Sequence, residues 1–171
     1  MVRDVKPDSR NRIAATPATA LDTKEVYRRR FRDEETFRDK MWQLLCHEYF
    51  QQFIPSTATV LEIAAGYCEF VNNISASQKI AVDINPETSK KANSDVRVII
   101  TPSTDLSALV TESIDIIFVS NLFEHLSKED ITRTVRECYR VMKAGGRFLI
   151  LQPNIRCLPR LLDVLRPHYP Y

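Results

Sequence analysis

The chain has 171 residues, of which 44% are hydrophobic and 27% charged, with a formal net charge of +2. These values predict one globular domain with a substantial core, and the balanced charge excludes a strong field of the kind that indicates nucleic-acid binding. No apolar run is long enough to span a bilayer and the first residues lack a signal peptide's apolar segment, so we expect a soluble, cytoplasmic protein.

The N-terminal third divides into an arm and a helical region. Residues 1–22 mix Pro, Asp, Ser, Thr and Arg without a hydrophobic period, which predicts a mobile arm. Over residues 24–54, aromatic and aliphatic side chains recur at steps of three and four, which predicts one long or two short amphipathic helices. Pro55 ends this helical region.

Five short, apolar, β-branched runs follow, separated by helical patterns. The runs are 60–64, 79–84, 96–100, 114–120 and 147–152, and the predicted helices are 68–74, 86–92 and 128–142, with a short turn at 106–110. Runs that are apolar on both faces are typical of buried parallel strands. Strands that alternate with helices predict an α/β fold with a doubly wound, mostly parallel sheet and right-handed crossovers.

Cysteine and glycine content narrows the kinds of site that the chain can form. The four cysteines (Cys46, Cys68, Cys138 and Cys157) stand far apart with no C-x-x-C pair, which predicts reduced thiols and neither a disulfide framework nor a zinc site. The chain has only 3 glycines, so we expect Gly66, Gly145 and Gly146 to lie where no other residue fits.

Two residues at the ends of the first two strands indicate a nucleotide-like ligand. Gly66 falls in the turn after the first strand, where a bare backbone lets a ligand approach. Asp83 closes the second strand, where a carboxylate can accept the hydroxyls of a ribose. The ligand is therefore either NAD or S-adenosylmethionine. Residues 64–69 read A-A-G-Y-C-E instead of G-x-G-x-x-G, and this favours the ligand without a pyrophosphate.

The same segments resemble the class I S-adenosylmethionine-dependent methyltransferases. Their first motif, hydrophobic-[DE]-x-G-x-G-x-G, aligns with residues 61–68, and their acid after the second strand aligns with Asp83. "IDIIFVSNLFEHL" and "VRECYRVMKAGGRFLILQPN" are similar to the later family segments, with Gly145 and Gly146 in the turn between helix and strand. The resemblance runs from about residue 57 to 154. It implies a Rossmann-like core, methyl transfer, and S-adenosylmethionine as cofactor.

Only one of the three motif glycines is present, because Ala64 and Cys68 occupy the other two positions. An alanine at the first position costs little if its φ angle is negative, and cysteine is small and apolar. We therefore expect cofactor binding that is weakened but not abolished.

The resemblance also implies roles for individual residues. Glu62 would orient the loop or contact the methionine amine, and the adenine would lie between Ile84 and residues 103–106. The family's acid for the adenine amino group is replaced by Thr, Pro and Ser at 101–103, so Asp105 is the substitute candidate. The cofactor-binding candidates are Glu62, Ala64, Gly66, Asp83, Ile84, Asp105, Leu106 and Asn121. Alternatively, Glu62 is a buried anchor for the helix and Asp105 only an N-cap.

Catalytic candidates follow the fourth strand. If the methyl acceptor is a hydroxyl, His125 and Glu124 are placed to remove its proton, since imidazole titrates near neutral pH. The alternative is structural, with Glu124 starting a helix and His125 packing or hydrogen bonding. Some family members bind a divalent metal through E-x-x-E-H at this place. Asn121 replaces the first acid here, which predicts no metal site.

The acceptor is only loosely indicated. Members of the family that methylate nucleic-acid bases carry [DNS]-P-P-[YFW] after the fourth strand, whereas this chain has S-N-L-F at 120–123. We therefore expect a small-molecule or glycan-like acceptor, methylated at oxygen. Gln152 and Asn154 either line the acceptor pocket or complete a turn.

The Arg-rich stretch 26–32 is followed by acids, which favours a solvated helix face over nucleic-acid contact. By resemblance to the family, residues 24–54 form a lid over the cofactor.

The C-terminal end indicates a shortened sheet. The family's sheet order is 3-2-1-4-5-7-6, whereas residues 155–171 are sufficient only for a short helix. We expect one domain (23–171, sheet core 57–154) with the last two strands missing through truncation. The edge of the fifth strand would then be covered by a second copy in a homodimer, a partner or the C-terminal tail. Two functions remain: an active methyltransferase, or a truncated or degenerate homologue that acts as a non-catalytic binding module.

Overall fold

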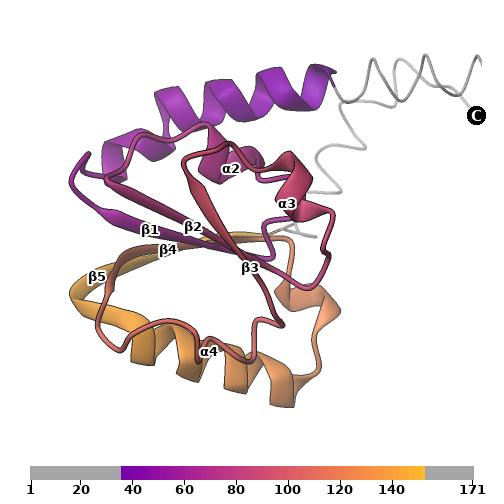
Figure 1. Cartoon of the computed structure of the whole chain (residues 1–171), viewed down its shortest axis with the longest axis vertical. Helices are drawn as coiled ribbons and strands as arrows, with labels where there is room; N and C mark the ends of the chain where they lie inside the picture. The colour runs from indigo at the N-terminus through magenta and orange to yellow at the C-terminus, as the bar shows by residue number, and fades with distance from the viewer. Residues whose placement is uncertain (1–35, 153–171) are drawn as a thin grey trace, which may run out of the picture. The chain divides into compact units, whose positions relative to one another are not determined.

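The structure is a computed structural model that describes residues 36–152 (Figure 1). Those from Asp39 onward belong to one compact unit. The predicted arm (1–22), the Arg-rich stretch (26–32), Cys157 and the predicted helix within 155–171 lie outside the described residues, as does Asn154.

Five parallel strands form one sheet in the order β3-β2-β1-β4-β5. The strands are β1 (Thr59–Ile63), β2 (Gln78–Asp83), β3 (Val96–Ile100), β4 (Ile114–Ser120) and β5 (Met142–Leu151). This order confirms the predicted doubly wound sheet. The strand order reverses between β1 and β4, and ligands of such folds bind beyond the carboxyl ends of the strands at that reversal.

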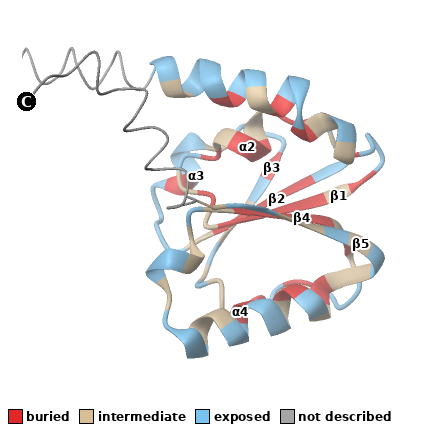
Figure 2. Cartoon of the chain, turned by 180° about the vertical axis from the view of Figure 1, so that it is seen from behind, coloured by how far each residue is buried: buried red, intermediate tan, exposed pale blue. Residues whose placement is uncertain are grey.

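Helices cover both faces of the sheet, as Figures 1 and 2 show. Residues 36–48 are helical and are followed by the 3-10 helix η1 (Phe50–Phe53). Residues 39–48 of this helix cover one face of the sheet, together with α2 (Glu69–Asn72) and α3 (Thr88–Lys91). Helix α4 (Lys128–Val141) covers the opposite face. The segment 106–110 forms turns without a helix, and α2 and α3 are each shorter than predicted.

The two faces of the sheet have different cores. The face toward residues 39–48 is aromatic: Phe70 and Phe118 stack with ring centroids 3.7 Å apart, and Trp42 and Phe50 pack edge-on against Phe118. The face toward α4 is aliphatic, with Cys138 and Val141 of the helix buried against β1, β2 and β4. Figure 2 shows these buried strands as a layer between exposed helix surfaces.

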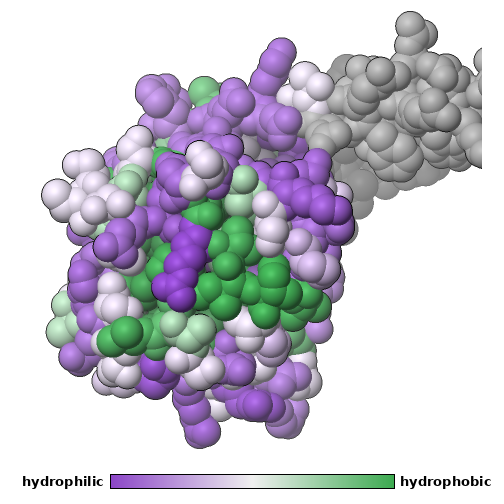
Figure 3. All heavy atoms as spheres, in the orientation of Figure 1, coloured by the Kyte–Doolittle hydropathy of each residue, from purple (hydrophilic) through white to green (hydrophobic). Residues whose placement is uncertain are grey.

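The β3 edge of the sheet is less well covered. No helix lies between β3 and β4 in the described chain, and Figure 3 shows apolar surface on the face that carries β3. Ile100 at the end of β3 is 44% exposed and Val110 in the following loop is 74% exposed. The missing helix therefore leaves apolar side chains at this edge in contact with solvent.

The glycine pair lies within β5, not in a turn before it as predicted. Strand β5 starts directly after α4, and its register with β4 shifts between Ile114 and Ile116, which marks a bulge. Gly145 has φ +78°, and a Cβ at Gly146 would approach the Met142 Cγ at 2.6 Å and the Lys143 carbonyl oxygen at 2.9 Å. Glycine is therefore required because the bulge folds the chain tightly onto itself.

Candidate functional site

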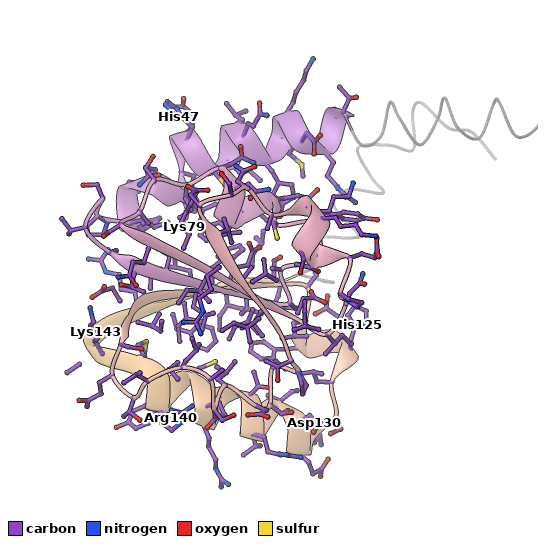
Figure 4. The ribbon with its side chains drawn as sticks, in the orientation of Figure 1. His47, Lys79, His125, Asp130, Arg140 and Lys143 are labelled. Atoms are coloured by element: carbon purple, nitrogen blue, oxygen red, sulfur yellow. The ribbon has the colours of Figure 1, made fainter. Side chains whose placement is uncertain are left out.

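A pocket of about 400 Å³ opens at the carboxyl ends of β1, β2 and β4. Its walls come from these strand ends, the loop after β3, and the start of α4; the lining residues are Ala64, Val82, Asp83, Ile84, Thr101, Pro102, Ser103, Thr104, Asn121, Leu122, His125, Leu126 and Asp130. Figure 4 shows His125 and Asp130 at this end of the molecule and Lys143 at the opposite end. The volume lies within the range of roughly 300–1,000 Å³ that is usual for small-molecule sites.

Asp83 and the Gly66 turn meet beside this pocket. The Asp83 Oδ2 accepts a hydrogen bond from the Gly66 N–H at 2.7 Å, and Oδ1 accepts one from the Asn85 N–H at 2.8 Å. The carboxylate therefore bridges the end of β2 and the turn after β1. A Cβ built at Gly66 meets no atom within 4 Å, so the turn presents open backbone.

The turn keeps a glycine-like backbone at all three motif positions. Ala64 has φ +56°, Gly66 +49° and Cys68 +60°. A negative φ, the condition under which Ala64 would cost little, is therefore not met, and each non-glycine residue here adds strain of about 1 kcal/mol. The Cys68 side chain points into the core, with its Sγ 3.8 Å from the Thr88 carbonyl oxygen, so it does not narrow the pocket.

Glu62 lies outside the pocket lining and anchors α2. Its side chain is 3% exposed, and its Oε2 accepts a hydrogen bond from the Val71 N–H at 2.9 Å. Burial raises the pKa of Glu62 to about 8, against the lowering effect of that hydrogen bond. Its position fits the structural alternative better than contact with a cofactor.

Two other candidates, Asp105 and Leu106, also lie away from the pocket lining. Asp105 is exposed, and its Oδ1 accepts a hydrogen bond from the Ser107 N–H at 3.0 Å. Hydrogen bonding from the Ser107 side chain, and then from this N–H, holds the pKa of the Asp105 carboxyl below its ordinary value. Leu106 is buried in the core on the α4 side. Ile84 and Asn121, in contrast, do line the pocket.

His125 lines the pocket, whereas Glu124 lies beside it. Both belong to the 3-10 helix η2 (Phe123–His125), and the His125 side chain is 73% exposed. The Glu124 Oε1 lies 4.0 Å from His125 Nε2, which is beyond hydrogen-bonding distance. Gln152 instead donates from its amide nitrogen to Glu124 Oε2, while its oxygen accepts from the Leu122 N–H at 3.2 Å. Gln152 therefore connects the end of β5 to the loop after β4.

Comparison with known families identifies this arrangement. A family described as the methyltransferase domain matches residues 61–150, which include most of β1, the pocket loops and most of β5. The chain belongs to this methyltransferase domain family. No curated protein matches it.

Two solved structures have a fold similar to that of this chain. An S-adenosylmethionine-dependent methyltransferase from Archaeoglobus fulgidus superposes with a TM-score of 0.62 at 26% identity, over 78% of this chain and 62% of that one. A protein from Pyrococcus horikoshii gives 0.60 at 21% identity, over 74% and 63% of the two chains. The chain thus spans less than two thirds of the length of either structure.

The domain contains pocket residues that sequence reasoning did not single out. Leu126 and Asp130 reach the pocket from the segment that leads into α4. Ser127 caps α4 by accepting a hydrogen bond from the Asp130 N–H at 3.1 Å, and the S-x-x-D pattern could have predicted this helix start. That α4 would turn Asp130 toward the pocket depends on long-range packing, which the pattern does not contain.

Within residues 36–152, no cluster of three or more His, Cys, Asp or Glu side chains could hold a metal ion. In the same range, the helices are too short or too polar to cross a membrane.

Proposed function

We propose that this chain binds S-adenosylmethionine in the pocket at the carboxyl ends of β1, β2 and β4 and transfers its methyl group to an acceptor. The observation that carries the proposal is the Asp83 carboxylate, held by the Gly66 N–H at 2.7 Å beside a pocket of about 400 Å³. Family membership supports the reaction class, and this contact supports a cofactor site at the end of β2.

The chemistry of the pocket suits a nucleoside without phosphates. Asp83 has acceptor capacity beyond its two backbone partners, because an ionised carboxylate offers about four lone-pair sites to donors such as ribose hydroxyls. Ile84 and Pro102 offer apolar surface to an aromatic base. Residues 64–69 have glycine at only one position of the G-x-G-x-x-G pattern, which disfavours the pyrophosphate of NAD.

When bound, S-adenosylmethionine supplies an electrophilic methyl group on a sulfonium, and the chain must align an acceptor with it. We assign His125 as the base that accepts the proton of a hydroxyl acceptor at its imidazole. Its place at the exposed rim of the pocket supports this role. A small-molecule or glycan-like acceptor methylated at oxygen suits a base at such an open rim.

A non-catalytic binding module is the second candidate. It is favoured by the strained backbone at Ala64 and Cys68, with φ of +56° and +60° at positions where the family carries glycine. Strain in the loop weakens cofactor binding if the loop must shift to admit the ligand.

Calorimetric titration of the full chain with S-adenosylhomocysteine, S-adenosylmethionine and NAD tests the proposal. We expect binding of the first two and none of NAD. The change Asp83→Asn should weaken binding by about tenfold or more, since hydrogen bonds to a charged group contribute about 1.5–3 kcal/mol.

The matched control is Asp105→Asn, the same substitution at an exposed carboxylate that also accepts a backbone N–H but lies away from the pocket. It should leave the affinity within about twofold of the parent, because surface changes away from a site have small effects. Binding of NAD but not of S-adenosylmethionine would contradict the proposal. Equal effects of Asp83→Asn and Asp105→Asn on the affinity would contradict it as well.

A further inference from the structure

Asp130 and Asp83 are the two acidic residues that line the pocket. Asp130 lies in the first turn of α4, far from Asp83 in the sequence, and its side chain is 43% exposed. Residues 101–103, where the family's acid for the adenine is expected, contain no carboxylate. Asp105 is exposed and lies outside the pocket lining. Asp130 is therefore the acid that can reach a base bound beside the loop after β3.

The packing of α4 explains why Asp130 faces this part of the pocket. Ser103 Oγ and Thr134 Oγ1 lie 2.9 Å apart, which holds the loop after β3 against α4. Thr134 is fully buried, and Asp130 precedes it by four residues, so the two lie on the same side of the helix. Asp130 thus shares the pocket wall with residues 101–104.

The Asp130 carboxylate has capacity for another donor. Its Oδ2 accepts a hydrogen bond from Ser127 Oγ at 3.0 Å, and its Oδ1 lies 3.9 Å from Arg133 Nη1. An ionised carboxylate offers about four lone-pair sites, so these two contacts leave it able to accept from a ligand. The contact with Ser127 alone would suit a purely structural helix cap, so binding measurements must distinguish this role from that of a ligand contact.

We propose that Asp130 accepts a hydrogen bond from the exocyclic amino group of the bound adenine and thereby makes the pocket selective for a 6-aminopurine. Pro102 and Leu126 of the same wall offer apolar surface to the ring, while the carboxylate meets its polar edge. The inference rests on the proposed function, because it requires an adenosyl cofactor in this pocket.

The test compares S-adenosylhomocysteine with S-inosylhomocysteine, in which a 6-oxo group replaces the 6-amino group. The parent chain should bind the adenosyl compound about tenfold or more tightly, since the oxo group leaves the carboxylate facing an acceptor. In Asp130→Asn, the side-chain amide can donate to the oxo group. The preference for the adenosyl compound should therefore fall to within about twofold or reverse, because the variant presents a hydrogen-bond donor where the parent presents only acceptors.

Glu129→Gln is the matched control. It removes the same charge from the same turn of α4, but Glu129 does not line the pocket. This variant should keep the parent's preference for the adenosyl compound. Thermal denaturation of both variants checks that each remains folded.

An equal loss of affinity for both compounds in Asp130→Asn would show a structural cap and overturn the inference. An unchanged preference would overturn it as well. Both results leave the proposed function intact, because the parent still binds S-adenosylhomocysteine. If the parent binds neither compound, the proposed function and this inference fail together.

Discussion

A cavity lies at each end of the sheet, but the carboxylates that line the two cavities have different hydrogen-bond partners. At the amino ends of the strands, a cavity of about 330 Å³ is lined by Asp115, Lys143 and Arg147. There the Asp115 carboxylate accepts hydrogen bonds from the Thr59 N–H at 2.8 Å and from Lys143 Nζ at 2.9 Å. These partners hold the pKa of Asp115 below its ordinary value. The charge of Asp115 is therefore neutralised by Lys143 within the protein.

At the carboxyl ends, Asp83 forms no ion pair with a described residue, and its partners are the backbone N–H groups of Gly66 and Asn85. Strained backbone gathers there too: three of the four non-glycine residues with positive φ in residues 36–152, Ala64, Cys68 and Asn121, follow β1 or β4. Strain and an unneutralised carboxylate are typical of functional sites. The two cavities therefore differ in charge pairing and in backbone strain, and both features favour the carboxyl end as the functional site.

The largest expected effect is on chemistry at the carboxyl end. Replacing His125 by Ala should lower turnover by about a hundredfold or more, because general-base catalysis contributes factors of about 10²–10⁴. The measurement is release of S-adenosylhomocysteine at saturating cofactor, with a panel of hydroxylated small molecules and glycans as acceptors. Cofactor affinity should stay unchanged.

His47→Ala is the control for this measurement, since His47 is an exposed histidine that contacts Glu48 at 2.8 Å and does not line the pocket. Equal turnover in both variants would return His125 to a structural role. Cofactor binding without turnover for any acceptor would favour the non-catalytic binding module.

The next effect is on the pH dependence of the free energy of unfolding, to which Glu62 and Asp115 contribute with opposite signs. Folded protein keeps the proton on Glu62 up to about pH 8, whereas the unfolded chain loses it near 4.5. Between these values the unfolded state binds fewer protons, so the free energy of unfolding falls as pH rises through this window and levels off above it. Asp115 has the opposite sign, because its lowered pKa contributes stability that is lost as pH falls.

The change Glu62→Gln should remove this fall, leaving the variant more stable than the parent at pH 8 by roughly 4 kcal/mol, an order-of-magnitude figure from the shift in pKa. Urea denaturation at pH 5 and pH 8 measures the difference. The exposed Glu129→Gln variant should follow the parent at both pH values. Parallel curves for the parent and Glu62→Gln would show that Glu62 ionises normally in the folded protein.

The smallest effect concerns the bulge at the amino end. A methyl group at Gly146 would meet backbone oxygens of Lys143 and Asp115 at 2.9 and 3.0 Å, so Gly146→Ala should lower the free energy of unfolding by about 2–3 kcal/mol. Gly145→Ala has open space but φ +78°, so its loss should be about 1 kcal/mol. Cofactor affinity of the folded fraction should not change in either variant. A loss of affinity would mean that the two ends of the sheet are coupled.

Much of the fold could be predicted because parallel strands buried on both faces have an unmistakable composition. Runs such as 114–120 match β4 as observed, and the alternation with helices implied right-handed crossovers. The resemblance to the methyltransferase family implied the order of the strands, which the structure has for all five. Helix lengths were less predictable. In α3, only Thr88 is buried, so few apolar contacts specify where the helix ends.

The candidate site was predicted in part. Gly66 and Asp83 were found because their place at strand ends is a local property of the sequence. Glu62 and Asp105 are carboxyl residues near the ends of strands, but their side chains do not line the pocket. The Glu62 side chain binds the backbone of α2, and the Asp105 side chain binds the backbone of its own turn.

The sequence by itself determined the doubly wound parallel sheet and the turn that meets Asp83, because hydrophobic periodicity and glycine placement act over short stretches of chain. The strand order followed from the resemblance to the methyltransferase family. Only the tertiary structure decided that Ala64 and Cys68 keep left-handed backbones and that Asp130 reaches the pocket. The place of Asp130 depends on α4 crossing the loop after β3, where Ser103 meets Thr134 across 31 residues of sequence. Such a contact is a product of packing, and no local pattern encodes it.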